Sequence, residues 1–282
     1  MRFINYNGNL INENDPIIGA NNRGLRYGDG LFETISYKKG NFVLLEAHLN
    51  RLWLGMELLK FDIPKLFNKT YILDQLNKLV SKNKHLPARI RLMVFRGDGG
   101  LYDPENLKPN FVIQSWPLHT ATHELNNNGL DLCIYRDARK CCDAFANIKH
   151  NNYLPYLMGA LHAKTQQCND AIILNQEDNV CDSTIANIFL IKDKRIFTPS
   201  LQQGCVAGTM RAFLIETLQL LDYEIVETAV SIDMLASADE VFLTNAIYNI
   251  RWVKSIENNQ YGVEEIQKIF YQLSKTNPLV IC

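Results

Sequence analysis

The segment NIKHNNYLP, residues 147–155, places a lysine directly before a predicted helix that begins near Tyr153. Pro155 falls in the first turn of that helix, where a proline is tolerated. A lysine held in a pocket loses part of its preference for the charged form and can act as an amine nucleophile toward a carbonyl group. A solvated loop lysine is the alternative interpretation. Lys149 is therefore the first candidate for a catalytic residue.

Length and composition are those of a folded protein with room for two domains. The chain has 282 residues, of which 47% are hydrophobic and 21% are charged. The formal net charge of −1 gives no indication of a nucleic-acid partner. No apolar run approaches the roughly 18 residues that cross a membrane, and no signal peptide is recognisable at the start. The seven cysteines lack C-x-x-C spacing, so we expect reduced thiols, a cytoplasmic protein and no metal site.

Hydrophobic periodicity predicts an α+β protein. We expect a small domain over residues 1–116, an interdomain connection over 117–128 and a larger domain over 129–282 that carries Lys149. Helices are predicted from Leu45 and over 71–81, 153–167, 210–221 and 263–274. Strands are predicted around the Asn7-Gly8 turn and over 31–37, 89–96, 111–116, 130–135, 171–174, 188–191, 196–198, 224–227 and 240–244.

Two segments suggest a site for a phosphate group. His48 and Arg51 share one face of the helix from Leu45, and an arginine there can hold a phosphate through two hydrogen bonds. The segment GCVAGTMR, residues 204–211, opens a helix whose N–H groups suit the same ligand. A surface ion pair and simple helix capping are the respective alternatives.

Two further segments suggest contacts to a heterocycle and to a carboxylate. Asp182 precedes a strand, where a buried carboxylate would keep a ring nitrogen protonated; an N-cap or turn residue is the alternative. Arg89 and Arg91 are two residues apart on a strand, so they point to one face. Two guanidinium groups on one face suit a carboxylate substrate, although a solvated strand face would show the same pattern.

The order of these motifs resembles the fold-type IV pyridoxal-phosphate (PLP) enzymes, the class IV aminotransferases. That family includes the branched-chain and D-amino-acid aminotransferases and 4-amino-4-deoxychorismate lyase. The resemblance covers nearly the whole chain and implies the two-domain fold of the D-amino-acid aminotransferases. The matching blocks are NNRGLRYGDGLFETI (21–35), HLNRL (48–52), NIKHNNYLP (147–155), DSTIANIF (182–189), GTMR (208–211) and ADEVFLTNA (238–246).

The resemblance also implies roles for individual residues. Lys149 would form the aldimine with PLP, and Arg51 would bind the cofactor phosphate. The phosphate site would be completed by the N–H groups of Thr209 and Met210 and by the Asn245-Ala246 turn. Tyr153 would lie near the ring oxygen and Asp182 near the ring nitrogen. Substrate would be bound by Arg89, Arg91 and Phe32, and a homodimer is expected.

Details of the motifs leave the reaction open. Asp182 stands where the family has Glu, and the GDGGLY segment (97–102) lacks the arginine of a similar loop in the lyases. Lys149-His150 and Asn245-Ala246 are lyase-like, whereas Tyr153 stands where lyases often carry Arg, and NYLP (152–155) is closer to the branched-chain aminotransferases.

We expect a branched-chain-like aminotransferase that moves an amino group from an amino acid to a 2-oxo acid. The alternative is the lyase, which releases pyruvate and 4-aminobenzoate from aminodeoxychorismate. A PLP-binding protein without turnover and an unrelated small-molecule binding module are the remaining hypotheses.

Overall fold

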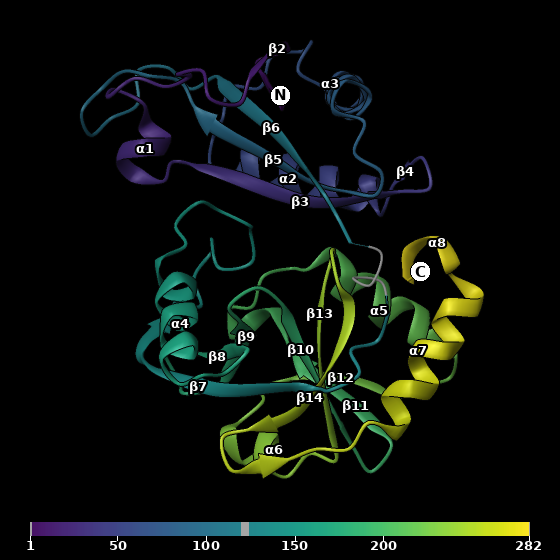
Figure 1. Ribbon diagram of the computed structural model, residues 1–282. Helices are drawn as coiled ribbons and strands as arrows, with labels where there is room; N and C mark the ends of the chain where they lie inside the picture. Colours follow the sequence, from purple (N-terminus) through teal and green to yellow (C-terminus); the bar gives the residue numbers. More distant parts are fainter. Residues whose placement is uncertain (1, 120–123, 282) are drawn as a thin grey trace. The chain divides into compact units, whose positions relative to one another are not determined.

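The computed structural model describes residues 2–119 and 124–281, which divide into two compact units (Figure 1). The first unit contains residues 2–119 together with Ile148–Asn152, and the second contains residues 124–147 and 153–281. The prediction placed Lys149 in the C-terminal domain, whereas its segment packs with the first unit. Part of the predicted connection, residues 120–123, lies outside the described residues. The predicted two-domain α+β class is confirmed.

The first unit is an antiparallel sheet with helices on one face. The elements in chain order are β1 (Phe3–Tyr6), β2 (Asn9–Asn12), α1 (Arg23–Tyr27), β3 (Gly30–Lys38), β4 (Asn41–Phe42), α2 (Leu45–Leu58), α3 (Lys69–Asn83), β5 (Ala88–Arg96) and β6 (Pro109–Pro117). The six strands are arranged in the order β2-β1-β6-β5-β3-β4. Asn7 and Gly8 both have positive φ, as the predicted two-residue turn between β1 and β2 requires.

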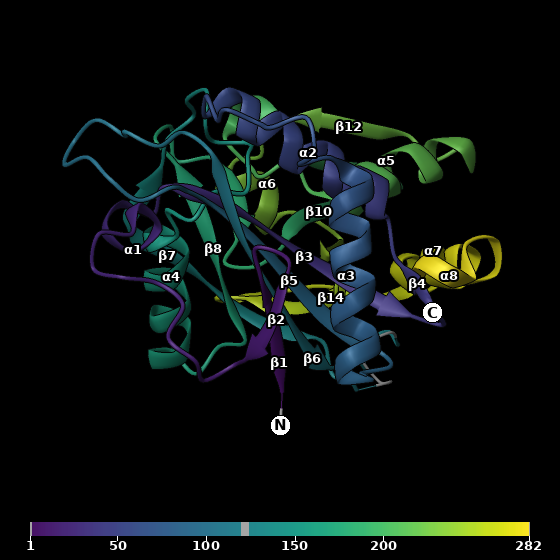
Figure 2. The same ribbon diagram turned by 90° about the horizontal axis from the view of Figure 1, so that it is seen from above.

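Helices α2 and α3 cover one face of this sheet (Figure 2). Leu49, Leu52 and Met56 of α2, which lie at helical spacing, are buried against Ile35 of β3 and its neighbours. Because alternate residues of a strand point to opposite faces, Leu31, Glu33 and Ile35 face the helices, and Phe32 and Thr34 face away. The two sets of residues on β3 therefore have different environments.

The second unit is built on a mixed sheet of nine strands. The elements are β7 (Leu130–Lys140), α4 (Leu154–Thr165), β8 (Asp170–Asn175), β9 (Val180–Ser183), β10 (Asn187–Lys192), β11 (Arg195–Pro199), η2 (Leu201–Gln203), α5 (Thr209–Leu220), β12 (Ile225–Thr228), α6 (Ile232–Ala236), β13 (Glu240–Asn245), β14 (Asn249–Ile256), β15 (Asn259–Gln260), α7 (Glu264–Thr276) and α8 (Pro278–Ile281). The strand order is β12-β11-β10-β13-β14-β7-β8-β9, and β15 pairs with β14.

Strand β14 is a central strand that the sequence pattern did not predict. It pairs antiparallel with β13 and parallel with β7, and its register with β7 shifts between Val253 and Ser255. This irregularity interrupts the alternation of polar and apolar residues on which strand prediction depends. No helix within the described parts of the chain has the length and apolar character to cross a membrane.

Candidate active site

Backbone hydrogen bonds to strand β3 fix the position of Lys149. The N–H of Phe32 donates to the carbonyl oxygen of Lys149 at 2.9 Å, and the N–H of Asn151 donates to that of Gly30 at 2.9 Å. Leu31 and His150 face each other between these two bonds as an antiparallel bridge. Strand β4 pairs only with the far end of β3, at Tyr37 and Lys38, which leaves this end to pair with residues 149–151. The segment is therefore joined to the edge of the sheet by an isolated bridge, and this pairing explains why it belongs to the first unit.

The ring of Phe32 lies between the sequence candidates of the first unit. The Nζ of Lys149 is 4.6 Å from the centroid of this ring, and the guanidinium carbon of Arg91 is 4.3 Å from it. Arg91 pairs with Thr34, two residues along β3 from Phe32, so both side chains lie on the face of the sheet away from α2. Arg89 lies one pair further along and is exposed. The fold thus brings together Lys149, Phe32 and Arg91, whereas Arg89 is more distant.

The opposite face of β3 carries a buried carboxylate that sequence reasoning missed. Both oxygens of Glu33 accept from Arg51, with Nε–Oε1 at 2.8 Å and Nη2–Oε2 at 2.5 Å. The Nδ1 of His48 lies 2.6 Å from Oε2. Glu33 was visible in the FETI motif next to Phe32, but nothing in the sequence paired it with the helix from Leu45. The predicted relation of His48 to Arg51 is therefore a shared contact with Glu33.

Electrostatics explain the charge state of this cluster. Burial alone would raise the pKa of Glu33, but Arg51 and the His48 hydrogen bond outweigh it and lower the pKa to about 2. Burial lowers the pKa of His48 more than Glu33 raises it, so His48 is neutral at pH 7. Since an ionised carboxylate only accepts, the Nδ1–H of His48 donates to Glu33. Arg51 is thereby held in a fixed orientation.

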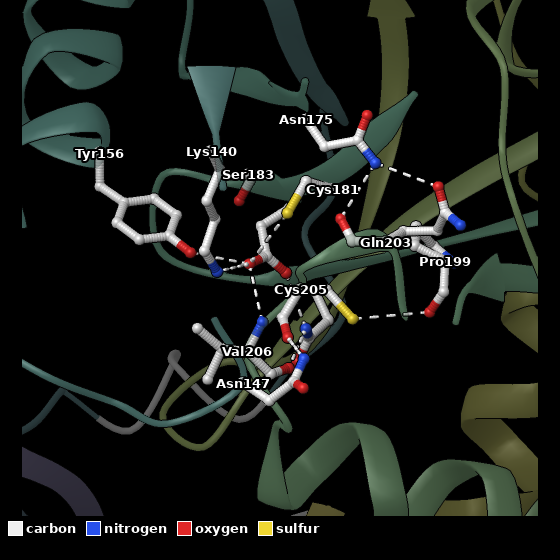
Figure 3. Close-up of polar contacts among 12 residues, drawn as sticks. Lys140, Asn147, Tyr156, Asn175, Cys181, Ser183, Pro199, Gln203, Cys205 and Val206 are labelled. Atoms are coloured by element: carbon white, nitrogen blue, oxygen red, sulfur yellow. Dashed lines mark hydrogen bonds and ion pairs between the residues drawn. The ribbon is translucent and has the colours of Figure 1, made fainter. Parts of the chain in front are cut away.

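Asp182 is the centre of a second buried cluster, in the second unit. Its Oδ2 accepts from the Tyr156 hydroxyl at 2.9 Å, from the Val206 N–H at 3.0 Å and from the Lys140 Nζ at 3.4 Å. Its Oδ1 accepts from the Asn187 Nδ2 at 2.8 Å. In Figure 3 the side chains of Lys140 and Tyr156 and the backbone of Val206 point toward one place, where dashed lines mark these hydrogen bonds. Asp182 lies in strand β9, so the alternative interpretation as an N-cap is wrong.

Burial raises the pKa of Asp182 more than Lys140 and the Val206 N–H lower it. Burial and the proximity of Asp182 also raise the pKa of Tyr156 well above its ordinary value, so this hydroxyl stays protonated and donates. Asn187 belongs to the DSTIANIF motif (182–189), whereas Tyr156 follows the NIKHNNYLP motif (147–155) and lay only within the predicted helix over 153–167. Lys140 lies in the polar run RDARK (136–140), which is typical of an exposed strand end, and so it gave no signal.

The Asp182 cluster continues to Tyr153 and to the start of α5. The ring of Tyr153 contacts that of Tyr156 with centroids 5.1 Å apart, and its hydroxyl donates to the Thr184 carbonyl oxygen at 2.7 Å. Asn187 also donates to the carbonyl oxygen of Val206 at 2.8 Å. Val206 lies two residues before Gly208, which is the N-cap of α5. Tyr153, Asp182 and the first turn of α5 therefore lie together.

The remaining candidates are at helix and strand ends. Thr209 and Met210 form the buried first turn of α5, which has neither a capping side chain nor an acidic residue. The Oδ1 of Asn245 accepts from the N–H groups of Ile247 and Tyr248, both at 2.9 Å, which closes the turn that contains Ala246. The Nδ2 of Asn245 donates to the carbonyl oxygen of Ile185 at 3.3 Å.

Comparison with known proteins gives the family. A model described as amino-transferase class IV matches residues 30–256. The chain belongs to the class IV aminotransferases. The predicted family and the prediction of an enzyme are both confirmed.

Relatives within the class IV aminotransferases carry more than one activity. The chain is 30% identical over 268 residues to the aminodeoxychorismate lyase of Bacillus subtilis, covering 92% of this chain and 88% of the relative. It is 24% identical over 287 residues to the branched-chain-amino-acid aminotransferase of Escherichia coli K12, covering 96% and 92%. A solved branched-chain aminotransferase of Thermoproteus uzoniensis with norvaline matches with a TM-score of 0.88 at 23% identity, covering 96% and 94%. Membership therefore gives the enzyme class and leaves the reaction open.

Class IV aminotransferases use PLP, and the second unit fits this cofactor in two places. Each carboxylate oxygen can accept two hydrogen bonds, and among the described residues the Oδ1 of Asp182 accepts only from Asn187. One position is therefore available for a ring N–H group. The first turn of α5 lacks a capping side chain and an acidic residue, which suits a phosphate.

Replacing Glu33 tests the ion pair that orients Arg51. We expect Glu33→Gln to lower the free energy of unfolding at pH 7 by roughly 3–5 kcal/mol, because it leaves a buried charge without its partner. Since burial with Arg51 and His48 lowers the Glu33 pKa to about 2, its contribution is fully present above the ordinary pKa of 4.5. The contribution is lost as the pH falls toward 2.

Urea unfolding of both proteins between pH 7 and pH 2 measures this difference. Glu57→Gln, at an exposed position of α2, the helix that carries Arg51, is the matched control and should leave the free energy of unfolding unchanged. A difference between wild type and Glu33→Gln that stays constant down to pH 2 would contradict the role of Glu33.

Replacing Gly208 tests the contact between the start of α5 and the Asp182 cluster. A Cβ atom at this position would lie 1.9 Å from the Oδ1 of Asn187, which would have to move. We expect Gly208→Ala to lower the free energy of unfolding by about 1–3 kcal/mol, as overpacking does. Gly19→Ala is the control, because a Cβ atom added there meets nothing within 4 Å. Thermal unfolding of Gly208→Ala and Gly19→Ala measures the difference. Equal melting temperatures would show that this contact is not tight.

Proposed function

We propose that this protein is a PLP-dependent aminotransferase that moves an amino group from an amino acid to a 2-oxo acid. One observation carries the proposal: the Lys149 amine and the Arg91 guanidinium both lie against the ring of Phe32. An α-amino acid carries its carboxylate on the carbon that bears the amino group. A lysine that works at that carbon therefore needs a carboxylate-binding group nearby, and Arg91 meets this requirement.

Each residue of the proposed site has a distinct task. PLP, when bound, supplies the electron sink that weakens the bonds at the substrate α-carbon. Lys149 binds the cofactor and moves the proton of the α-carbon with its Nζ as general base. Arg91 binds the substrate carboxylate. Phe32 shields the aliphatic part of the substrate from water. Arg89 is exposed and takes the role of an outer contact at most.

Other residues bind the cofactor in this proposal. The Oδ1 of Asp182 accepts the N–H of the pyridine ring, and Tyr153 contacts the ring oxygen. Arg51, held by Glu33, binds the phosphate together with the N–H groups of Thr209 and Met210 and the turn at Asn245 and Ala246. Branched-chain amino acids are the substrates that we propose first, because NYLP (152–155) is similar to the branched-chain aminotransferases.

The second candidate function is 4-amino-4-deoxychorismate lyase. It is favoured by the identity of 30% to proteins of that name and by the Lys149-His150 pair. The structure gives the arginines beside the GDGGLY segment other partners: Arg96 binds Asp29 and the carbonyl oxygen of Leu59, and Arg23 binds Asp29 and the carbonyl oxygen of Tyr102. Neither therefore replaces the arginine that the lyase loop carries, so the aminotransferase remains our first proposal.

We also propose that the protein is a homodimer. Four apolar side chains of α4 are 41–61% exposed at the spacing of one helix face: Leu154, Leu157, Met158 and Leu161. An apolar stripe of this kind on a water-facing helix is typical of an interface. The family resemblance implies that the partner is a second copy of the chain.

A spectrum of the protein with PLP tests the function. We expect an absorbance band that changes on addition of L-leucine or L-glutamate, with release of the matching 2-oxo acid. D-alanine and aminodeoxychorismate are tested separately, and formation of 4-aminobenzoate and pyruvate from aminodeoxychorismate would establish the lyase instead.

Two variants test the roles of individual residues. Lys149→Ala should abolish both the band and turnover. Arg91→Gln should raise KM for the amino acid by about tenfold or more, as loss of a charged contact of about 1.5–3 kcal/mol does.

Sedimentation velocity tests the dimer. We expect the wild type to sediment as a dimer at micromolar concentration and Leu157→Glu/Leu161→Glu to sediment as a monomer, because two charges cannot be buried in an apolar interface. Leu220→Glu, at a position 78% exposed on α5, is the control and should remain dimeric. A wild-type monomer would rule out the proposed interface.

A further inference from the structure

Lys140 is a buried cation that the proposed mechanism does not use. Its side chain is 8% exposed, and its Nζ lies 3.4 Å from the Oδ2 of Asp182. The same Nζ lies 5.2 Å from the centroid of the Tyr156 ring. Burying a lysine is costly unless it is paired, so its position at the end of β7 calls for an explanation.

The strand register explains how Lys140 reaches Asp182. Lys140 of β7 pairs with Asn175 of β8, and Asp182 of β9 pairs with Ile173 on the other side of β8. The lysine side chain therefore extends past one strand to meet a carboxylate on the next. An aspartate, which is one methylene shorter than glutamate, keeps this carboxylate close to its own strand.

The two oxygens of Asp182 have unequal numbers of donors. Oδ2 accepts from Lys140, Tyr156 and Val206, and the Cys181 thiol lies 4.0 Å away. Oδ1 accepts from Asn187 among the described residues. Since an oxygen has room for about two good hydrogen bonds, Oδ2 is saturated and Oδ1 is the oxygen that can accept another.

We propose that Lys140 is a positioning residue whose positive charge, beside the Oδ2 of Asp182, keeps the carboxylate negative, so that Oδ1 receives the ring N–H of the cofactor. The inference rests on the proposed function, because it requires PLP to bind at Asp182. Lys140 acts only through Asp182 and is not a catalytic residue.

The charge of Lys140 decides whether the proton between Asp182 and the ring nitrogen of the cofactor resides on the nitrogen or on the carboxylate. In the ionic arrangement the ring nitrogen carries the proton and Asp182 is negative, and in the neutral arrangement the proton is on Asp182. The ammonium group lies next to Asp182 and so stabilises the ionic arrangement. The other titratable groups around Asp182 are Tyr156, Cys181 and Cys205, which burial keeps in their protonated, uncharged forms. Lys140 is thus the cation that contacts Asp182 within the described parts of the chain.

The test is the nitrogen-15 chemical shift of PLP labelled at the ring nitrogen, measured on the holoprotein as a function of pH. We expect Lys140→Met to move the shared proton toward Asp182, with about a tenfold change in the ratio of the ionic to the neutral arrangement, so that at a given pH the chemical shift moves toward that of an unprotonated ring nitrogen. Lys140→Arg should restore the wild-type shift, because it restores the charge. Lys140→Gln removes the charge and keeps a donor, so it replaces Lys140→Met if that variant does not fold.

A matched control and a reference variant separate the outcomes. Lys254→Met removes an exposed lysine that lies 3.8 Å from Asp131 and should leave the shift unchanged. Asp182→Asn should shift the ring nitrogen at least as far as Lys140→Met does. A normal shift in both Lys140→Met and Lys140→Gln, with a changed shift in Asp182→Asn, would overturn the inference and leave the proposed function intact. A wild type that binds no PLP would overturn both.

Discussion

A carboxylate that is taken out of water must be met by donors, and this constraint organises both units of the protein. Glu33 and Asp182 are almost completely buried. Glu33 is met by Arg51 and His48 of α2, and Asp182 is met by Lys140, Tyr156, Val206 and Asn187. In each case the donors come from elements other than the strand that carries the carboxylate, because an unpaired buried charge would cost several kcal/mol. The same side chains are those that the proposed site uses or orients.

Strand β3 connects the core of the first unit to its candidate site. Glu33 faces α2, Phe32 faces the opposite way, and the N–H of Phe32 holds the carbonyl oxygen of Lys149. Because the side-chain period of a strand is two, one residue can stabilise the core while the next contacts the lysine. A shift of the register by one residue would exchange the two faces, so the buried Glu33 pairing also fixes where Phe32 points.

Asp182 stands where the sequence resemblance implies a glutamate. The structure places a buried lysine next to its carboxylate. The positive charge of the lysine offsets part of the cost of burying this carboxylate.

The fold class and the family could be predicted from the sequence, which also named most of the residues of the candidate site. Helix and strand periodicities indicated the majority of the elements, and six motifs in order indicated the family. Three features became visible only when the chain had folded: Lys149 belongs to the first unit, Glu33 holds Arg51, and Lys140 contacts Asp182. These are contacts between residues far apart in the chain, in the last case across an intervening strand. Local patterns report which face of an element is apolar, but they carry no information about which polar groups meet when helices pack on strands and strands pair with one another.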